Sequence, residues 1–314
     1  MSDPRALVIG EALVDVVEHA DGRREEHPGG SPANVALGLA RLGRAVDLLT
    51  WLAPDDYGTR VTSHLEESGV HVITGDRFPV ATPVAMARLD ERGQASYEFD
   101  LTWDLPAAWP GDDVPPLVVH TGSIATTLTP GGPAVLREVT ARRATSTVTY
   151  DPNARPALMG TPEQALPVVD AFVAVADVVK ASEDDLVWLH PAEEPDDVAA
   201  RWAQSGPAVV VVTHGEHGAF AATAGGARLQ VPAVPVTVAD TVGAGDSFMS
   251  GLIDGLWAEG LLGAENREAL RAIDEDTLRR VLDRCIRIAA ITVSRAGANP
   301  PRRAELDAVL SPEG

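Results

Sequence analysis

The chain contains the run Asp240-Thr241-Val242-Gly243-Ala244-Gly245-Asp246. It follows a stretch rich in β-branched residues and precedes one in which apolar residues recur every four positions up to residue 257, as on one face of a helix. The sequence therefore predicts a strand, a glycine turn and a helix. Amides in the first turn of a helix lack intrahelical partners and favour an anion. Gly243 and Gly245 allow close approach of the backbone, so a phosphate is the expected ligand.

Asp246 falls in the first turn of this predicted helix. A carboxylate beside a bound phosphoryl group can accept the proton of an attacking hydroxyl. The alternative is that Asp246 only complements the positive end of the helix dipole. A dinucleotide-binding fingerprint fits less well, because its third glycine would be at position 248, where Phe248 stands.

Composition excludes several classes of protein. The 314 residues carry 25 basic and 46 acidic side chains, a net charge of −21, which disfavours nucleic acid and anionic membranes as partners. Cys285 is the only cysteine, so no intrachain disulfide or multi-cysteine metal site can form. The sequence has neither a signal-peptide core nor eighteen consecutive apolar residues, and we expect a cytoplasmic protein of 45% hydrophobic content.

Lys180 is the only lysine, since every other residue in the count of basic side chains is arginine. The chain has no G-x-x-x-x-G-K-[ST] loop and no strand of the protein-kinase type carrying a lysine. Any phosphate must therefore be bound by a different structural motif.

Short apolar runs alternate with amphipathic stretches, which predicts an α/β fold with a mostly parallel sheet. The predicted strands are residues 6–9, 46–51, 117–120, 147–150, 178–180 and 209–213. Residues 31–42 predict a helix, with Pro32 in its first turn and Gly43 as its stop. A hairpin is expected over 219–231, with its turn at residues 225–226.

Two stretches with alternating apolar and polar residues, approximately 14–27 and 83–101, predict a small sheet that projects as a lid. Tyr97 and Phe99 are its candidate apolar contacts to a ligand, and ordinary sheet packing is the alternative. Closure of such a lid would exclude water from a reaction. No linker divides the chain, so we expect one domain over 1–314.

The run Asp-Thr-Val-Gly-Ala-Gly-Asp-Ser-Phe resembles the second signature of the ribokinase-like (phosphofructokinase B type) carbohydrate kinases. The resemblance implies an α/β ribokinase-like fold with a central mostly parallel sheet flanked by helices on both faces. It also implies that Gly243, Ala244 and Gly245 form an anion hole and that Asp246 is the catalytic base.

A second segment, residues 29–34 (Gly-Gly-Ser-Pro-Ala-Asn), looks like the first signature of the same family, which binds the sugar. The resemblance assigns sugar contacts to Gly30 and Asn34, and also to Asp15, which follows the first strand. A turn with a helix-start asparagine, and a solvated acid at Asp15, are the alternatives.

Residues 213–218 (Thr-His-Gly-Glu-His-Gly) resemble the nucleotide loop of the family, on Thr213, Gly215 and Gly218. Metal binding by the two histidines of this loop is a weaker alternative, because they lack the H-E-x-x-H spacing. Ser182 and Asp185 stand where the family has an asparagine and a glutamate near magnesium and phosphate. A capped helix start is the alternative there.

Four further positions follow from the resemblance. Asp240, Val242 and Gly297 match backbone ligands of a monovalent cation, potassium, although Pro301 stands where some relatives have a serine ligand. Residues 151–155 (Asp-Pro-Asn-Ala-Arg) look like a feature of the fructokinase branch. Arg155 then faces sugar or phosphates, with a surface ion pair as the alternative.

The expected reaction is therefore ATP-dependent phosphorylation of a primary sugar hydroxyl, with Mg²⁺ and with fructose as the favoured sugar. A 2-keto-3-deoxygluconate kinase or ribokinase is the alternative within the family. A non-catalytic sugar or nucleotide sensor with this fold is the alternative from another class. A homodimer through the lid would cover the exposed edges of its sheet.

Overall fold

The computed structural model describes residues 4–89, 95–106 and 114–310, with the backbone alone at residues 89 and 95–98. In these residues the apolar runs form a nine-stranded sheet in the order β13-β12-β11-β10-β9-β8-β1-β4-β5. All neighbouring strands are parallel except the pairs β11–β12 and β12–β13. The strands are β1 (Arg5–Ile9), β4 (Ala45–Leu49), β5 (Val70–Ile73), β8 (Val118–Gly122), β9 (Thr147–Asp151), β10 (Val178–Ser182), β11 (Val209–Thr213), β12 (Ala219–Thr223) and β13 (Arg228–Val231).

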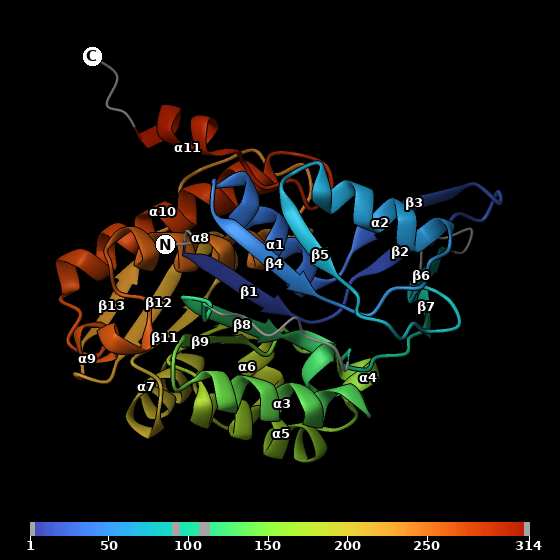
Figure 1. Ribbon diagram of the computed structural model, residues 1–314. Helices are drawn as coiled ribbons and strands as arrows, with labels where there is room; N and C mark the ends of the chain where they lie inside the picture. The colour runs from blue at the N-terminus through green and yellow to red at the C-terminus, as the bar shows by residue number, and fades with distance from the viewer. Residues whose placement is uncertain (1–3, 90–94, 107–113, 311–314) are drawn as a thin grey trace.

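Helices cover both faces of this sheet (Figure 1). One face carries α1 (Ser31–Arg41), α2 (Asp56–Glu66), α8 (Ala244–Ala258) and α10 (Glu275–Val293). The other carries α3 (Gly131–Arg142), α5 (Pro162–Val175), α6 (Glu183–Leu189) and α7 (Pro195–Ser205). The remaining short elements are η1 (Ser123–Thr126), α4 (Pro156–Met159), η2 (Gly215–His217), η3 (Ala264–Asn266), α9 (Arg267–Arg271) and α11 (Arg303–Leu310). The predicted mostly parallel sheet with two helical layers is confirmed.

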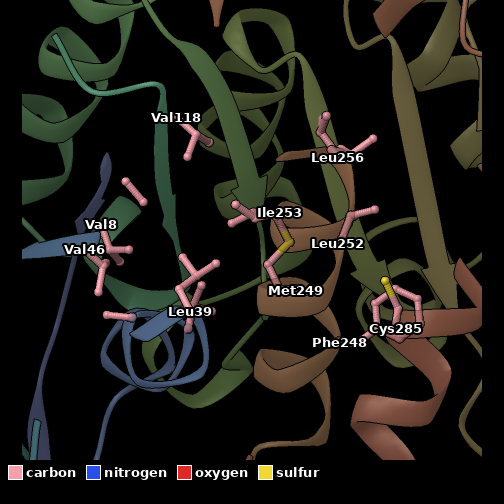
Figure 2. Close-up of a cluster of buried hydrophobic side chains, with 14 of the residues drawn as sticks. Val8, Leu39, Val46, Val118, Phe248, Met249, Leu252, Ile253, Leu256 and Cys285 are labelled. Atoms are coloured by element: carbon pink, nitrogen blue, oxygen red, sulfur yellow. The ribbon is translucent and has the colours of Figure 1, made fainter. Parts of the chain in front are cut away.

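Alternate side chains of the strands point into two separate apolar cores. In β1, Val8 packs with the cluster under α1 and α8, whereas Leu7 and Ile9 pack with the cluster under α5 and α6, because successive strand residues face opposite sides. Figure 2 shows the first core, in which Phe248, Met249, Leu252, Ile253 and Leu256 of α8 meet side chains of the central strands. Burial of this face fixes α8, and with it the position of the glycine turn that precedes it.

A second, four-stranded sheet lies beside the large one, at the end of the molecule next to α2 (Figure 1). Its order among the described residues is β3-β2-β6-β7, with β2 (Leu13–Glu18), β3 (Arg24–Gly29), β6 (Val84–Leu89) and β7 (Ala95–Asp100). These strands occupy the two segments that the alternating pattern predicted. Phe99 is half-buried opposite Ala85, and the side chain of Tyr97 lies outside the described residues.

The strand predicted immediately before residue 240 is wrong. Residues 232–239 form no strand, and Val234, Val236 and Val238 are 37%, 40% and 56% exposed. Pro232 and Pro235 interrupt the run and have no amide to donate. The amides of Ala239 and Asp240 instead donate to the carbonyl of Val293 at the end of α10, so this segment closes the last turn of that helix.

The helices of the described residues include none long and apolar enough to span a bilayer.

Candidate active site

The carboxyl ends of β1, β8, β9, β10 and β11 meet at one edge of the large sheet, because these strands are parallel neighbours. Between β1 and β8 the order of strands along the chain changes direction, and ligands of open α/β sheets bind at such a switch point. Three chemically active residues follow these strand ends closely. Glu11 comes after β1, Ser123 after β8, and Asp151 ends β9, and all three are buried.

Two glycines shape the turn that begins α8. Gly243 has φ of +75°, and a Cβ there would lie 2.6 Å from Cβ of Ala298, so only glycine fits without strain. Gly245 has an ordinary φ, and the nearest atom to a Cβ placed there is Nζ of Lys180, at 3.1 Å. Asp246 lies in the first turn of α8, as predicted. The amides of residues 244–246 start the helix, and that of Ala244 donates to the carbonyl of Thr241 at 3.3 Å. The first amides of a helix have no acceptor within the helix itself, which favours an anion at this place.

The carboxylate of Asp246 is 7% exposed and held by three side chains. Its Oδ1 accepts from Ser31 Oγ at 2.7 Å and from Asn153 Nδ2 at 3.3 Å. Its Oδ2 accepts from Asn34 Nδ2 at 2.8 Å. The segments 29–34 and 240–246, which the sequence analysis matched to two separate signatures, therefore meet at this one carboxylate.

Gly30 makes that meeting possible. Its φ is +103°, and a Cβ there would lie 2.5 Å from the carbonyl oxygen of Glu11, so the start of α1 packs directly on the chain leaving β1. Gly30 also accepts the amide of Asn34 in the first turn of α1. The predicted sugar residues Gly30 and Asn34 are thus next to Asp246.

Asp15 in β2 keeps access to solvent, while its Oδ2 lies against Gly29 of the neighbouring strand β3, where a Cβ would be only 2.0 Å away. Burial raises the pKa of Asp15 to about 6, with Asp246 adding to this effect, while Arg155 and His27 oppose it. The exposed Arg155 donates to Asn153 Oδ1 at 2.7 Å and to the carbonyls of residues 153 and 154. The charges of Asp15, Arg155 and Asp246 therefore act on one another across a shared space.

A buried ion pair lies behind the glycine turn. Lys180 Nζ of β10 is 2.7 Å from Asp151 Oδ2 of β9, and both side chains are at most 3% exposed. Burial raises the pKa of Asp151 to about 7; Lys180 opposes this shift, and Asp185 and Asp246 add to it. Burial, reinforced by Lys180, lowers the pKa of His120 to about 3. The only lysine thus lies among carboxylates at the start of α8.

Ser182 and Asp185 form a capping box at the start of α6, which is the alternative that the sequence left open. Asp185 accepts from the amide of Ser182 at 2.8 Å with one oxygen and from that of Ala154 at 2.6 Å with the other. In the described part of the chain no three His, Cys, Asp or Glu side chains are grouped to hold a metal ion. These residues fit a magnesium ion that arrives with phosphate and water ligands, and they form no cage for it.

The predicted nucleotide loop, residues 213–218, connects β11 to β12 through η2. Gly215 and Gly218 have φ of +53° and +100°. His214 lies between two carboxylates, Asp196 at 2.8 Å and Glu183 at 3.3 Å, so its ring nitrogens are already partnered. The metal alternative for this loop thus has no group of three ligands in the described residues.

Two concavities lie in this part of the chain's surface or along the segment that follows β13. The larger one, of ≈ 380 Å³, adjoins the loop and is lined by Glu183, Asp196, His214, His217, Ala219, Gln230, Val231 and Pro232. An apolar one of ≈ 160 Å³ is lined by Val234, Pro235, Val236, Arg287, Ala290, Ile291, Ser294 and Val309. The second lies along the segment that leads to the glycine turn.

Asp240 joins two loops. Its Oδ1 accepts the amide of Val242 at 3.0 Å and its Oδ2 accepts that of Gly297 at 2.8 Å, and these bonds hold the pKa of Asp240 below its usual value. The three residues matched to a cation site are thus neighbours in the fold.

The sequence analysis gave no role to several residues that now lie at the site. Ser31 was part of a quoted motif, Asn153 and Asp151 were part of another, and Lys180 was noted only as the single lysine. Asp151 and Asn153 carried one usable signal, a polar residue at or just after the carboxyl end of a parallel strand.

Comparison with known proteins identifies the family. The model of the pfkB family carbohydrate kinases matches residues 3–304. A fructokinase of Klebsiella pneumoniae is 33% identical over 262 residues, covering 81% of this chain and 85% of that protein. A fructokinase of Escherichia coli is 31% identical over 318 residues, covering 96% and 98%.

A solved structure is also similar. It is a double mutant of the fructokinase of Vibrio cholerae O395 bound to fructose, ADP and a potassium ion. It is 26% identical, with a TM-score of 0.80 and coverage of 99% of this chain and 100% of that one. The fold and the site define a phosphotransferase that acts on sugar. The chain belongs to the pfkB family of carbohydrate kinases.

Proposed function

We propose that this protein transfers the γ-phosphoryl group of ATP to the primary hydroxyl of fructose, giving fructose 6-phosphate. The observation that carries the proposal is the position of Asp246. Its carboxylate lies in the first turn of α8, beside the backbone amides that start this helix, and contacts the start of α1 through Ser31 and Asn34. A base and an anion site are thus next to a surface rich in hydroxyl-binding groups.

In the proposed reaction, Asp246 takes the proton of the sugar hydroxyl. That oxygen forms a bond to the γ-phosphorus while the bond from phosphorus to the β,γ-bridging oxygen breaks, and ADP leaves with the electron pair. The amides at Gly243, Ala244 and Gly245 stabilise the charge of the phosphoryl oxygens. The sugar is oriented by Asp15, Gly30, Asn34, Phe99 and Arg155.

The apolar concavity is the proposed site of the adenine ring. Val234, Val236 and Ile291 offer apolar surface to a flat base, and the chain runs from there to the glycine turn. The larger concavity is less suitable for an apolar base, because its lining includes the charged side chains of Glu183 and Asp196. Between base and turn, the phosphates then pass Thr213, Gly215 and Gly218, with Ser182 and Asp185 beyond them.

Two ions complete the proposal. Magnesium is bound to the phosphates of ATP, where it neutralises part of their charge. Potassium is bound near Asp240, Val242 and Gly297, whose loops are held together by the hydrogen bonds of Asp240. The potassium ion in the Vibrio cholerae enzyme supports this part of the proposal.

Fructose is preferred to 2-keto-3-deoxygluconate or ribose because relatives named fructokinases are 31–33% identical to the chain. The other class of function is a sensor that binds sugar or nucleotide without turnover. The intact base and glycine turn favour an enzyme.

We also propose one domain over 1–314, a cytoplasmic location without nucleic acid or membrane partners, and a homodimer that pairs the small sheets.

The test is ADP release over fructose, ribose, tagatose, 2-keto-3-deoxygluconate and nucleosides, with Asp246→Asn as the variant. The amide of this variant cannot take a proton, so turnover should fall by roughly 10²- to 10⁴-fold while sugar binding, measured by calorimetry, persists. Asp276→Asn is the matched control, since Asp276 is an exposed acid in the first turn of α10. Near-normal turnover by Asp246→Asn contradicts the proposal, and binding without ADP release by the unmodified protein indicates a sensor.

A further inference from the structure

Asn153 has a backbone conformation that few residues adopt. It follows β9 with φ of +37°, in the left-handed region where asparagine is one of the tolerated residues. The backbone N–H of Asn153 donates to Asp151 Oδ1 at 3.2 Å. This conformation directs its side chain toward the starts of α1 and α8, where it reaches Ser31 and Asp246.

The side chain of Asn153 is one member of a chain of hydrogen bonds in which each residue donates to the next, from Arg155 to Asp246. Arg155 donates to Asn153 Oδ1 at 2.7 Å, Asn153 Nδ2 donates to Ser31 Oγ at 2.7 Å, and Ser31 donates to Asp246 Oδ1 at 2.7 Å. The guanidinium of Arg155 has donors only, so the oxygen of the Asn153 amide must face Arg155. The NH₂ group must then face Ser31 and Asp246, and the orientation of the amide is settled by its partners.

The two oxygens of Asp246 are consequently unequal. Oδ1 accepts from both Ser31 and Asn153, whereas among the described residues Oδ2 accepts only from Asn34. A carboxylate oxygen has two lone-pair positions. Oδ1 is therefore filled, and Oδ2 keeps one position that is open to a further donor.

We infer that Asn153 is a positioning residue, which acts with Ser31 to occupy Asp246 Oδ1 and so leaves Oδ2 as the oxygen that accepts the proton of the sugar hydroxyl. This inference rests on the proposed function. Asn153 contacts the base and has no part in binding the phosphate. Its loss leaves the Asp246 carboxylate free to rotate and to hold a proton on Oδ1, so fewer encounters have an acceptor in line with the hydroxyl.

The main test is Asn153→Gly, because glycine tolerates φ of +37° and the variant removes only the side chain. We expect kcat to fall by roughly 10- to 100-fold, as for a lost hydrogen bond to a charged group. The KM for sugar should change less than kcat, because Arg155 keeps its hydrogen bonds to the carbonyls of residues 153 and 154. A carboxylate that loses donors keeps its proton more readily. The acid limb of the kcat–pH profile should therefore move up by roughly one pH unit.

Two further variants separate positioning from folding. Asn153→Asp keeps the size of the side chain and replaces the donor with a second carboxylate beside Asp246, so it should move the acid limb further in the same direction. Ser31→Ala combined with Asn153→Gly should cost less than the product of the two single effects, because both residues act on one oxygen. Asn266→Ala, which removes an asparagine that binds Leu262 far from the site, is the control and should leave the pH profile in place.

The outcomes distinguish the inference from the proposed function. An unmodified protein that releases no ADP with any sugar overturns the proposed function. An active unmodified protein whose Asn153→Gly variant keeps its kcat and its acid limb overturns the inference alone, as does a fall in kcat that Asn266→Ala reproduces.

Discussion

Lys180 Nζ lies 2.7 Å from Asp151 Oδ2, with both side chains buried behind the glycine turn of the active site. The pair is surrounded by further acids, since Asp185 and Asp246 both raise the pKa of Asp151. One cation therefore offsets several carboxylates at the place where a nucleotide would bring more negative charge. Repulsion among these groups would otherwise oppose nucleotide binding.

Lys180→Met should lower both the free energy of unfolding and the kcat/KM for ATP. Loss of one partner leaves Asp151 buried without its counter-charge, at a cost of about 3 kcal/mol in the free energy of unfolding at pH 8. The cost should shrink at pH 6, because Asp151 can then take up a proton. We also expect kcat/KM for ATP to fall roughly 100-fold. Urea unfolding at the two pH values and steady-state kinetics measure these effects.

The double variant Lys180→Met/Asp151→Asn is the control for this prediction. It removes the uncompensated charge and should recover most of the stability. Recovery of kcat/KM as well would show that Lys180 acts only by neutralising Asp151, against our expectation.

Sugar binding should depend on the ionisation of Asp15. Burial raises the pKa of this carboxyl to about 6, so it becomes neutral as the pH falls through that value. A neutral carboxyl is a weaker acceptor for sugar hydroxyls. The Kd for fructose, measured by calorimetry, should rise as the pH falls from 7 to 5. Asp15→Asn should bind weakly at both values, and a Kd that stays constant in the unmodified protein would refute the assignment.

Glu11 should make the protein less stable as the pH rises. Burial raises the pKa of Glu11 from 4.5 to about 7 in the folded state. Between these values the folded chain holds a proton that the unfolded chain has lost, so stability falls with increasing pH. The full penalty is present above pH 7 and is on the order of 3 kcal/mol. Below pH 4.5 both states are protonated and the penalty vanishes.

Glu11→Gln tests this, because glutamine has no proton to lose. The difference in free energy of unfolding between pH 5 and pH 8 should decrease by the amount that Glu11 contributes. Glu66→Gln, at an exposed acid in α2, should leave that difference unchanged. Equal slopes in the Glu11→Gln variant and the unmodified protein would contradict the prediction.

The sequence predicted best what neighbouring residues determine. Helix α1 and the glycine turn before α8 depend on local signals, namely proline in the first turn and glycine at positive φ, and the structure has both at the predicted positions. The failed strand before residue 240 had the right composition, but a strand also needs a partner that no local pattern supplies. Two proline residues and the free end of α10 determined the conformation of that segment instead.

The contacts of Asp246 could be predicted only in part. Asp15 and Asn34 were expected at the site because a family resemblance covered them. The pairing of Lys180 with Asp151 depends on β9 and β10 being neighbours in parallel register, and the contact of Asn153 with Ser31 spans 122 positions of sequence. Such contacts are set by the packing of the whole sheet, which local patterns in a single sequence do not specify.

Asp254 should be needed for stability and not for catalysis. It is fully buried in α8 and binds three arginines from separate segments, Arg44 at 2.7 Å, Arg284 at 3.1 Å and Arg303 at 2.6 Å. Asp254→Ala leaves these guanidinium groups without their counter-charge and should reduce the free energy of unfolding by about 3–5 kcal/mol. Asp254 is two helical turns from Asp246, roughly 12 Å along the axis, so kcat and KM at 20 °C should remain within about twofold for the folded fraction. Asp283→Asn, at an exposed acid of α10, should change neither quantity, and a loss of kcat in Asp254→Ala without a loss of stability would show that the cluster serves the site directly.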